Sequence, residues 1–363
     1  MPPGKRNKIL IVCPHPEGTA PGQRLKYEQY FGYFRDSGFD VVVKSFMSAR
    51  FQNMVYKKGN LSEKIFWTLA GYCRRFLLLF SLRKYEIVYI FLWVTPFGPP
   101  FFEWLYCKLG KRIIYDIDDM IYLKAPHSPN PGVAWLKGKT KPIFLFKKAD
   151  YVLTSTPAIE EYAKRFNDKV INIPVTIDTV KYTPKEKYDT EKITLGWSGS
   201  VSTSPYLHLL DNMLLELHKK HDFKLFVMGD PNFKIEGLEI EAIPWKEEYE
   251  VSTIRRFDIG LYPLPHDNWV HGKGGGKALQ YMAAGVPTVA TAVGANFKII
   301  ENGVSGYLVK MDEEWLDRIE KLMESETLRK QIGQKGAKIV QDHFSVHANK
   351  EVYLSVLREA LLQ

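Results

Sequence analysis

Segments rich in β-branched residues alternate with segments of helical spacing along the whole chain. A linker around residues 179–190 separates two series of this kind. The strands expected in the first series are 8–13, 40–45, 87–92, 112–116, 151–154 and 170–173. The strands expected in the second series are 193–197, 224–228, 239–243, 259–262 and 287–291. Strands that alternate with helices predict parallel sheets covered by helices, so we expect an α/β chain of two doubly wound, Rossmann-like domains.

The expected helices fill the spaces between these strands. They cover residues 23–37, 101–109, 157–166, 206–220, 246–257, 277–284, 313–325 and 346–362. A chain of 363 residues is too long for one ordinary hydrophobic core, which agrees with two domains.

The composition indicates a globular protein of a reducing compartment. Hydrophobic residues make up 45% of the chain and charged residues 25%, which is typical of soluble proteins. The three cysteines, Cys13, Cys73 and Cys107, are far apart and lack metal-ligand spacing. The N-terminal residues lead directly into a strand, so we expect no signal peptide and a cytoplasmic location.

A glycine-rich loop at residues 272–276, Gly-Lys-Gly-Gly-Gly, leads into the expected helix 277–284. The free N–H groups and the positive dipole end of a helix attract anions. Lys273 and Lys277 add two full charges at the same place. The loop therefore indicates a site for a doubly negative group such as a nucleotide diphosphate. A tight strand-to-helix connection with surface lysines is the alternative.

Positive charge is concentrated in the first half of the chain. Nine basic residues and one acid, Glu63, lie between Lys44 and Lys84, so this segment carries +8 of the formal net charge of +9. It includes an aromatic-rich helical stretch, residues 65–80, with Arg74 and Arg75 in its middle. Such a helix is able to lie on an anionic bilayer. The alternative is an ordinary domain helix with a solvated basic edge, and no nucleic-acid motif accompanies the charge.

The order of residues after the glycine loop resembles a family signature. Residues 277–291, Lys-Ala-Leu-Gln-Tyr-Met-Ala-Ala-Gly-Val-Pro-Thr-Val-Ala-Thr, are similar to the nucleotide-sugar segment of the retaining glycosyltransferases of family 4 (group 1), which have the GT-B fold. Further matches in the family's order are residues 115–119, 149–157, 196–200, 227–229 and 257–264. The family usually carries two glutamates eight residues apart across this loop, where this chain has Gly272 and Gln280.

The resemblance implies a hexosyltransferase-type enzyme that moves a sugar, with retention, from a UDP-sugar or GDP-sugar. It implies an acceptor domain at residues 1–183, a nucleotide-sugar domain at 184–344 across a cleft, and a helix at 345–363 that crosses back. It implies no cofactor besides the donor substrate and no catalytic metal. With the basic segment, it predicts a lipid-linked or glycan acceptor in envelope polysaccharide or glycolipid synthesis. The expected location is cytoplasmic, with an anionic inner membrane face as a candidate partner and no nucleic acid.

Most candidate site residues lie in the expected nucleotide-sugar domain. We expect Lys277 to stabilise the leaving diphosphate, because the loop after strand 193–197 lacks the Arg and Lys that many family members carry there. Gln280 occupies the position of the family's second glutamate, which binds the ribose hydroxyls. Its amide can still donate and accept hydrogen bonds there. The other expected donor contacts are Gly199, Ser200, Trp245, Lys273, Gly274 and Gly275. The alternatives for these residues are a turn of small residues, core or lid packing, and solvated lysines.

The first domain contributes an arginine and a group of acids. Residues 115–119, Tyr-Asp-Ile-Asp-Asp, place three acids where a strand ends, and these repel one another unless they are relieved. We expect Asp118 or Asp119 to contact the donor sugar or the acceptor hydroxyl and the others to cap a helix. A purely structural cluster is the alternative. Arg24 opens a helix and either binds a phosphate or lies on the surface. His15 and His271 are weaker candidates.

Two other functions remain open from the sequence. A sugar-nucleotide epimerase would use the same fold, although the Glu-rich segments expected of one are absent. A non-catalytic nucleotide-sugar binding protein would agree with Gly272 and Gln280 in place of the two glutamates.

Overall fold

The computed structural model describes residues 6–55, 57, 59–123 and 140–362, and it divides into two compact units. One unit consists of Met1–Pro174 with Lys350–Gln363, and the other of Val175–Asn349. Residues 175–183, which the sequence placed in the first domain, group with the second unit. Ile177 forms a bridge with Ser345, and the Tyr182 hydroxyl accepts a hydrogen bond from Gln280.

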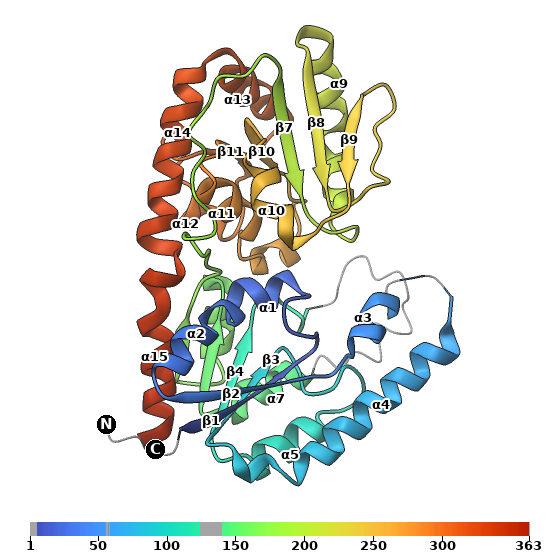
Figure 1. The fold of residues 1–363 in the computed structure, drawn as a ribbon, viewed down its shortest axis with the longest axis vertical. Coiled ribbons are helices and arrows are strands. Elements are labelled where there is room, and N and C mark those ends of the chain that lie inside the picture. The colour runs from blue at the N-terminus through green and yellow to red at the C-terminus, as the bar shows by residue number, and fades with distance from the viewer. Residues whose placement is uncertain (1–5, 56, 58, 124–139, 363) are drawn as a thin grey trace. The chain divides into compact units, whose positions relative to one another are not determined.

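The first unit contains a six-stranded parallel sheet with the strand order β2-β1-β3-β4-β5-β6 (Figure 1). Its strands are β1 (Asn7–Cys13), β2 (Phe39–Ser45), β3 (Ile87–Phe91), β4 (Ile113–Ile117), β5 (Tyr151–Thr154) and β6 (Val170–Asn172). Its α-helices are α1 (Pro21–Lys26), α2 (Phe31–Asp36), α3 (Ala49–Val55), α4 (Leu61–Leu79), α5 (Phe101–Leu109), α7 (Thr140–Lys148) and α8 (Pro157–Lys164). The strand order of this sheet reverses between the neighbouring strands β1 and β3.

The second unit repeats this plan with the strand order β12-β11-β10-β7-β8-β9 (Figure 1). Its strands are β7 (Ile193–Ser198), β8 (Phe223–Met228), β9 (Ile240–Ile243), β10 (Ile259–Tyr262), β11 (Thr288–Thr291) and β12 (Tyr307–Val309). Its α-helices are α9 (Asp211–Lys220), α10 (Glu247–Ile254), α11 (Gly276–Ala283), α12 (Asn296–Ile299), α13 (Asp312–Glu324) and α14 (Glu326–Ile339). The order reverses between β7 and β10, and ligands of such sheets bind at the carboxyl ends of the strands beside this reversal.

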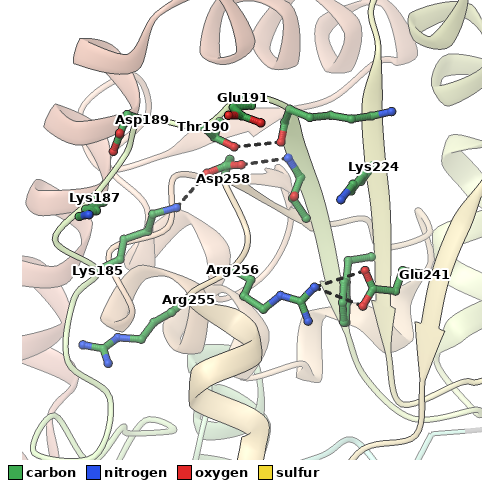
Figure 2. Close-up of a pocket in the computed structure, with 13 residues that line it drawn as sticks. Lys185, Lys187, Asp189, Thr190, Glu191, Lys224, Glu241, Arg255, Arg256 and Asp258 are labelled. Atoms are coloured by element: carbon green, nitrogen blue, oxygen red, sulfur yellow. Dashed lines mark hydrogen bonds and ion pairs between the residues drawn. The ribbon is translucent and has the colours of Figure 1, made fainter.

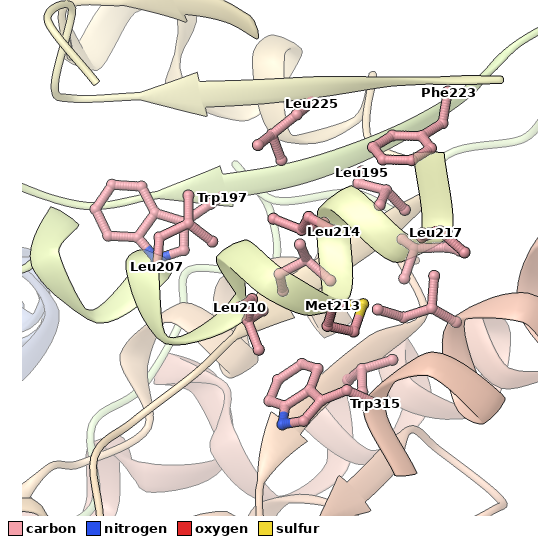
Figure 3. Packing of buried hydrophobic residues seen from close by; sticks show 14 of the residues in the cluster. Leu195, Trp197, Leu207, Leu210, Met213, Leu214, Leu217, Phe223, Leu225 and Trp315 are labelled. Atoms are coloured by element: carbon pink, nitrogen blue, oxygen red, sulfur yellow. The ribbon is translucent and has the colours of Figure 1, made fainter. Parts of the chain in front are cut away.

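The two doubly wound parallel sheets confirm the predicted fold class. Hydrophobic spacing explains how helices cover them. In the second unit Leu214 and Leu217 of α9, and Leu210 directly before this helix, lie on one helix face. They pack against Leu195 of β7 (Figure 3). Trp315 of α13 belongs to the same cluster, so one core joins the sheet to two helices.

Some elements differ from the sequence expectation. The expected helix 23–37 is interrupted, because Tyr27 leaves helical geometry with φ −131° and its buried ring packs against Tyr89 and Phe91. Strand β12 and helix α14 were not anticipated. The last helix, α15 (Val346–Leu362), agrees with its predicted bounds. The ring centre of its Tyr353 lies 4.5 Å from that of Tyr30 of the first unit, with the rings tilted by 46°, and the Tyr353 hydroxyl donates to the Lys26 carbonyl.

Candidate functional site

The glycine loop and the start of α11 form the centre of the candidate site in the second unit. Gly275 adopts φ +71°, and a Cβ there would lie 2.2 Å from Ile299 Cδ1, so only glycine fits. Helix α11 begins at Gly276, one residue earlier than expected, and Lys277 lies in its first turn, as expected. Lys273 lies in the glycine loop before α11, and its ammonium is 5.2 Å from the centre of the Trp269 ring.

Lys277 points at aromatic rings instead of at an acid. Its ammonium lies 5.3 Å from the Trp197 ring centre and 5.5 Å from that of Tyr262, at the ends of β7 and β10. These are the strands between which the sheet order reverses. Across the residues that the structure describes, this ammonium has no hydrogen bond and no ion pair. Burial, and secondarily the charge of Lys273, lower the pKa of Lys277 to about 8. A cation in this position is one that an anion would stabilise.

Gly199 creates the space that Lys277 occupies. A Cβ on Gly199 would lie 2.3 Å from the Trp197 ring and 2.8 Å from Lys277 Cε. The Gly199 amide donates to the Met228 carbonyl at 2.9 Å, and the Ser200 amide donates to the Thr203 hydroxyl at 3.2 Å. Both amides that the sequence offered to a phosphate are therefore already hydrogen bonded. Gly199 contributes room at the end of β7, and Ser200 is exposed.

Gln280 lies one turn further along α11 and belongs to a buried polar network. Its Nε2 donates to the Tyr182 hydroxyl at 2.7 Å and to Glu250 Oε1 at 3.0 Å. The same Glu250 oxygen accepts from Trp245 Nε1 at 2.8 Å. Both Nε2 hydrogens are thus in use, and within the described chain Oε1 has no partner. Gln280 therefore offers an acceptor to a ligand.

Sequence reasoning missed Glu250 and Tyr182, the two residues that fix the Gln280 amide. Glu250 is only 4% exposed on α10, and Tyr182 lies in the linker around residues 179–190. The sequence could have flagged Glu250, because it lies five residues after Trp245 at the start of a short helix. It offered no signal for Tyr182, which is 98 residues from Gln280 along the chain.

The three acids after β4 of the first unit separate into two kinds. Asp116 is fully buried, lies 3.4 Å from Lys26 Nζ and accepts from the Tyr89 hydroxyl. Asp118 and Asp119 are half-buried beyond the end of the strand. A Cβ on Gly22 would lie 2.5 Å from Asp118 Oδ2, so this glycine lets the Asp118 carboxylate approach the start of α1.

Asp119 and His15 make local contacts in the first unit, and Arg24 is mostly buried there. Asp119 Oδ1 accepts from the Met120 amide at 2.9 Å, which fixes the turn after β4. Arg24 is 9% exposed in α1, so it is not the plain surface arginine of the alternative reading. His15 Nδ1 lies 2.7 Å from Gln52 Oε1, and burial lowers the pKa of His15. In the second unit, His271 is exposed.

Arg75 corrects the expectation that the basic residues between Lys44 and Lys84 all lie on the surface. Its guanidinium is fully buried and donates to the carbonyls of Cys13, Lys44 and Val94 at 2.8, 2.7 and 2.9 Å. Its charge therefore holds α4 to the first sheet. Arg74 is half-buried and donates to the Phe46 carbonyl, and Lys58 lies outside the described residues.

A pocket of the second unit lies at the edge of its sheet opposite to Lys277 (Figure 2). It is lined by the starts of β7 and β8, at Thr194 and Lys224. Its charges largely neutralise one another: Lys185 Nζ lies 2.9 Å from Asp258 Oδ1, and Arg256 lies 3.2 Å from Glu241 Oε1. Paired charges at the amino-terminal strand ends do not favour a ligand site, so the candidate site remains at the Lys277 edge.

The two Rossmann-like units give the chain the GT-B fold. Solved structures share this fold. Sucrose-phosphate synthase from Thermosynechococcus elongatus superposes with a TM-score of 0.73 at 16% identity, covering 98% of this chain and 99% of that one. Anabaena HepE in complex with UDP and glucose gives 0.70 at 14% identity, covering 97% and 100%.

The sequence comparisons find a family match within the second unit. Residues 192–325 match the family described as Glycosyl transferases group 1, which confirms the predicted resemblance. The capsular polysaccharide biosynthesis glycosyltransferase CapM of Staphylococcus aureus is 23% identical over 178 residues. That match covers 44% of this chain and 45% of CapM, less than half of either protein.

Proposed function

We propose that this chain is a retaining glycosyltransferase that moves a sugar from a nucleoside-diphosphate sugar to an acceptor. The observation that carries the proposal is Lys277, an ammonium with a lowered pKa and no anionic partner in the described chain, at the reversal of the second sheet. The family match over residues 192–325 covers this region and supports the same conclusion.

The chemistry needs positive charge where the diphosphate leaves. As the bond between the sugar and the diphosphate breaks, negative charge develops on the phosphate oxygens. Lys277 would donate to these oxygens, and Lys273 would add charge from the glycine loop. A diphosphate bound there raises the pKa of Lys277, so the ammonium stays protonated through the reaction.

The ribose and base would lie beside Gln280. Its unpartnered Oε1 can accept a hydrogen bond from a ribose hydroxyl, while Glu250 and Tyr182 hold the amide still. Trp245 is fixed by the same Glu250 and would line the base. UDP is the first nucleotide to test, because HepE and Staphylococcus aureus TarM both have structures in complex with UDP.

The first unit would supply the acceptor side. Asp118 or Asp119 would contact the acceptor hydroxyl or the donor sugar, and Arg24 would contact a phosphate. The resemblance to the retaining family favours front-face attack, in which the acceptor would attack the face of the sugar from which the diphosphate leaves. CapM is named for capsular polysaccharide biosynthesis, which favours a lipid-linked or glycan acceptor in envelope polysaccharide or glycolipid synthesis.

The proposal is tested by incubating the protein with UDP-sugars and GDP-sugars and measuring free nucleotide. A transferase releases nucleotide slowly without acceptor, and Lys277→Met abolishes this release. Lys330→Met, at an exposed lysine of α14, is the matched control and retains it. Unchanged donor with measurable binding would favour a non-catalytic binding protein, and an interconverted donor would favour an epimerase.

A further inference from the structure

The outward face of α4 in the first unit is almost entirely apolar. Seven large hydrophobic residues of α4 and the residue after it are between 50% and 77% exposed: Leu61, Ile65, Phe66, Leu69, Phe76, Leu77 and Phe80. We call these residues the α4 surface. Helix α5 lies against α4 and adds Phe101 and Trp104, which are 57% and 42% exposed (Figure 1). Contiguous exposed apolar area of this kind marks an interaction site.

The opposite face of α4 is fixed to the first unit, so the helix cannot turn the α4 surface inward. Arg75 donates to three carbonyls near the carboxyl ends of β1, β2 and β3. One turn earlier, a Cβ on Gly71 would lie 2.5 Å from the Phe46 ring, so the helix backbone rests directly on that ring. The polar anchor thus lies inside, and the apolar residues lie outside.

Basic residues flank the α4 surface. Lys57 is exposed before the helix, and Arg83 and Lys84 are exposed after it. Glu63, the only acid between positions 44 and 84, is paired with Arg50 at 2.9 Å. Apolar side chains between clusters of positive charge match a bilayer, which offers an apolar interior below anionic headgroups. A second copy of the chain would bring the same positive charge against itself.

We propose that the α4 surface docks on an anionic lipid bilayer, with α4 lying in the plane of the interface. The helix has 19 residues, about 28 Å at ~1.5 Å per residue, and none of the described helices is long and apolar enough to cross a membrane. Leu69, Phe76 and their neighbours enter the headgroup region, Trp104 lies at its boundary, and Arg83 and Lys84 contact the headgroups.

The place of α4 connects this surface with the acceptor, and this part of the inference rests on the proposed function. Arg75 binds the helix at the carboxyl ends of the strands of the first sheet. Asp118 and Asp119 follow the carboxyl end of β4 in the same sheet. A bilayer at the α4 surface would therefore lie at the edge of this unit that carries the candidate acceptor residues, as a lipid-linked acceptor requires.

Cosedimentation with vesicles tests the proposal. The probes are phosphatidylcholine vesicles, with and without about one quarter phosphatidylglycerol. The wild type should bind the anionic vesicles and retain part of this binding at high salt, because apolar contacts are not screened. Phe66→Gln/Leu69→Gln/Leu77→Gln should weaken binding at least tenfold. The matched control is Val180→Gln/Met311→Gln/Leu362→Gln, at three residues 60–87% exposed elsewhere, and it should bind normally.

The charges have a separate signature. Arg83→Gln/Lys84→Gln should weaken binding to anionic vesicles about fivefold for each charge at low salt and leave the salt-resistant part intact. Wild-type binding by the triple α4 variant would overturn the proposal. A wild-type dimer that the same variant converts to a monomer, with no vesicle binding by either protein, would assign the surface to a second copy instead.

A label on the native chain gives a measurement that does not depend on variants. Cys73 is exposed on α4, whereas Cys13 is buried and Cys107 is partly buried. An environment-sensitive fluorophore on Cys73 should shift to the blue with anionic vesicles, and an unchanged spectrum would contradict the proposal. Transfer to a water-soluble acceptor should be unaffected in the triple variant. Lys277→Met should still bind vesicles, so the two proposals can fail independently.

Discussion

The two units each carry a lysine near the carboxyl edge of a six-stranded parallel sheet, and the two lysines have opposite surroundings. Lys26 of the first unit is enclosed by acceptors: the carbonyls of Thr154 and Ile173, and the Asp116 carboxylate at 3.4 Å. Lys277 of the second unit faces two rings and, among the described residues, no acceptor. Burial lowers the pKa of both lysines. Their partners, and not the direction of the pKa shift, distinguish the structural cation Lys26 from Lys277, the cation that we propose binds a ligand.

The contrast first predicts a large difference in stability. Lys26→Met leaves Asp116 buried without its cation, which should cost about 3–5 kcal/mol of unfolding free energy. Lys277→Met should change it by less than about 1 kcal/mol, since the lysine gives up only contacts with rings. Urea unfolding of ligand-free protein measures both, with Lys330→Met as control. Equal losses in the two variants would remove the distinction.

The same pair should reverse its order in activity per folded molecule. Lys277→Met should lower transfer about a hundredfold or more, as expected when one donor to a developing charge is removed. The expected loss is in kcat as well as kcat/KM, because the charge grows as the diphosphate leaves. Initial rates at saturating donor measure it. A near-normal rate of the Lys277→Met variant would contradict the assignment of Lys277 to the leaving diphosphate.

Gln280 predicts a smaller effect of another kind. A ribose contact is present before and during the reaction, so Gln280→Ala should raise the donor KM about 5-fold to 30-fold and change kcat less. Glu250→Gln keeps the shape but weakens the hold on the Gln280 amide, so its KM should rise by a smaller factor in the same direction. A large fall in kcat at unchanged KM in either variant would contradict this role.

The smallest expected effect is none. If the lysines supply the charge at the diphosphate, the enzyme needs no divalent ion there, and EDTA should leave the transfer rate unchanged. Loss of activity in EDTA that Mg²⁺ or Mn²⁺ restores would show that a metal, and not Lys277, neutralises the leaving group.

Local patterns in the sequence predicted the elements whose spacing is regular. The strand over Tyr151–Thr154 and the helix over Val346–Leu362 agree with expectation, and the glycine loop indicated the start of α11. The break at Tyr27 was not predictable, because ring packing against Tyr89 decides it. The short strand Tyr307–Val309 gives too little pattern to separate it from a loop.

The polar residues of the candidate sites divide in the same way. Lys277 became a candidate because it follows a glycine-rich loop at a helix start, which is a local property of the sequence. Glu250 and Tyr182 reach Gln280 only through the fold, over 30 and 98 residues. Arg75 looked like a surface charge among its neighbours, and only the three carbonyls contributed by distant segments show that it is structural.

The central claim is that the Lys277 ammonium binds the diphosphate, and calorimetric titration with UDP and with uridine tests it most directly. Without ligand, Lys277 has a pKa of about 8 and loses its proton above that pH. A bound diphosphate would keep the lysine protonated. The affinity for UDP should therefore fall about tenfold or more between pH 7.5 and 9.5, at up to about tenfold per pH unit. The uracil base loses a proton of its own at high pH in both ligands, so the fall attributed to Lys277 is the fall in UDP affinity relative to uridine. Lys277→Met should bind UDP weakly at both values. A wild-type UDP affinity independent of pH, or a variant that prefers UDP over uridine as strongly as the wild type, would contradict the account.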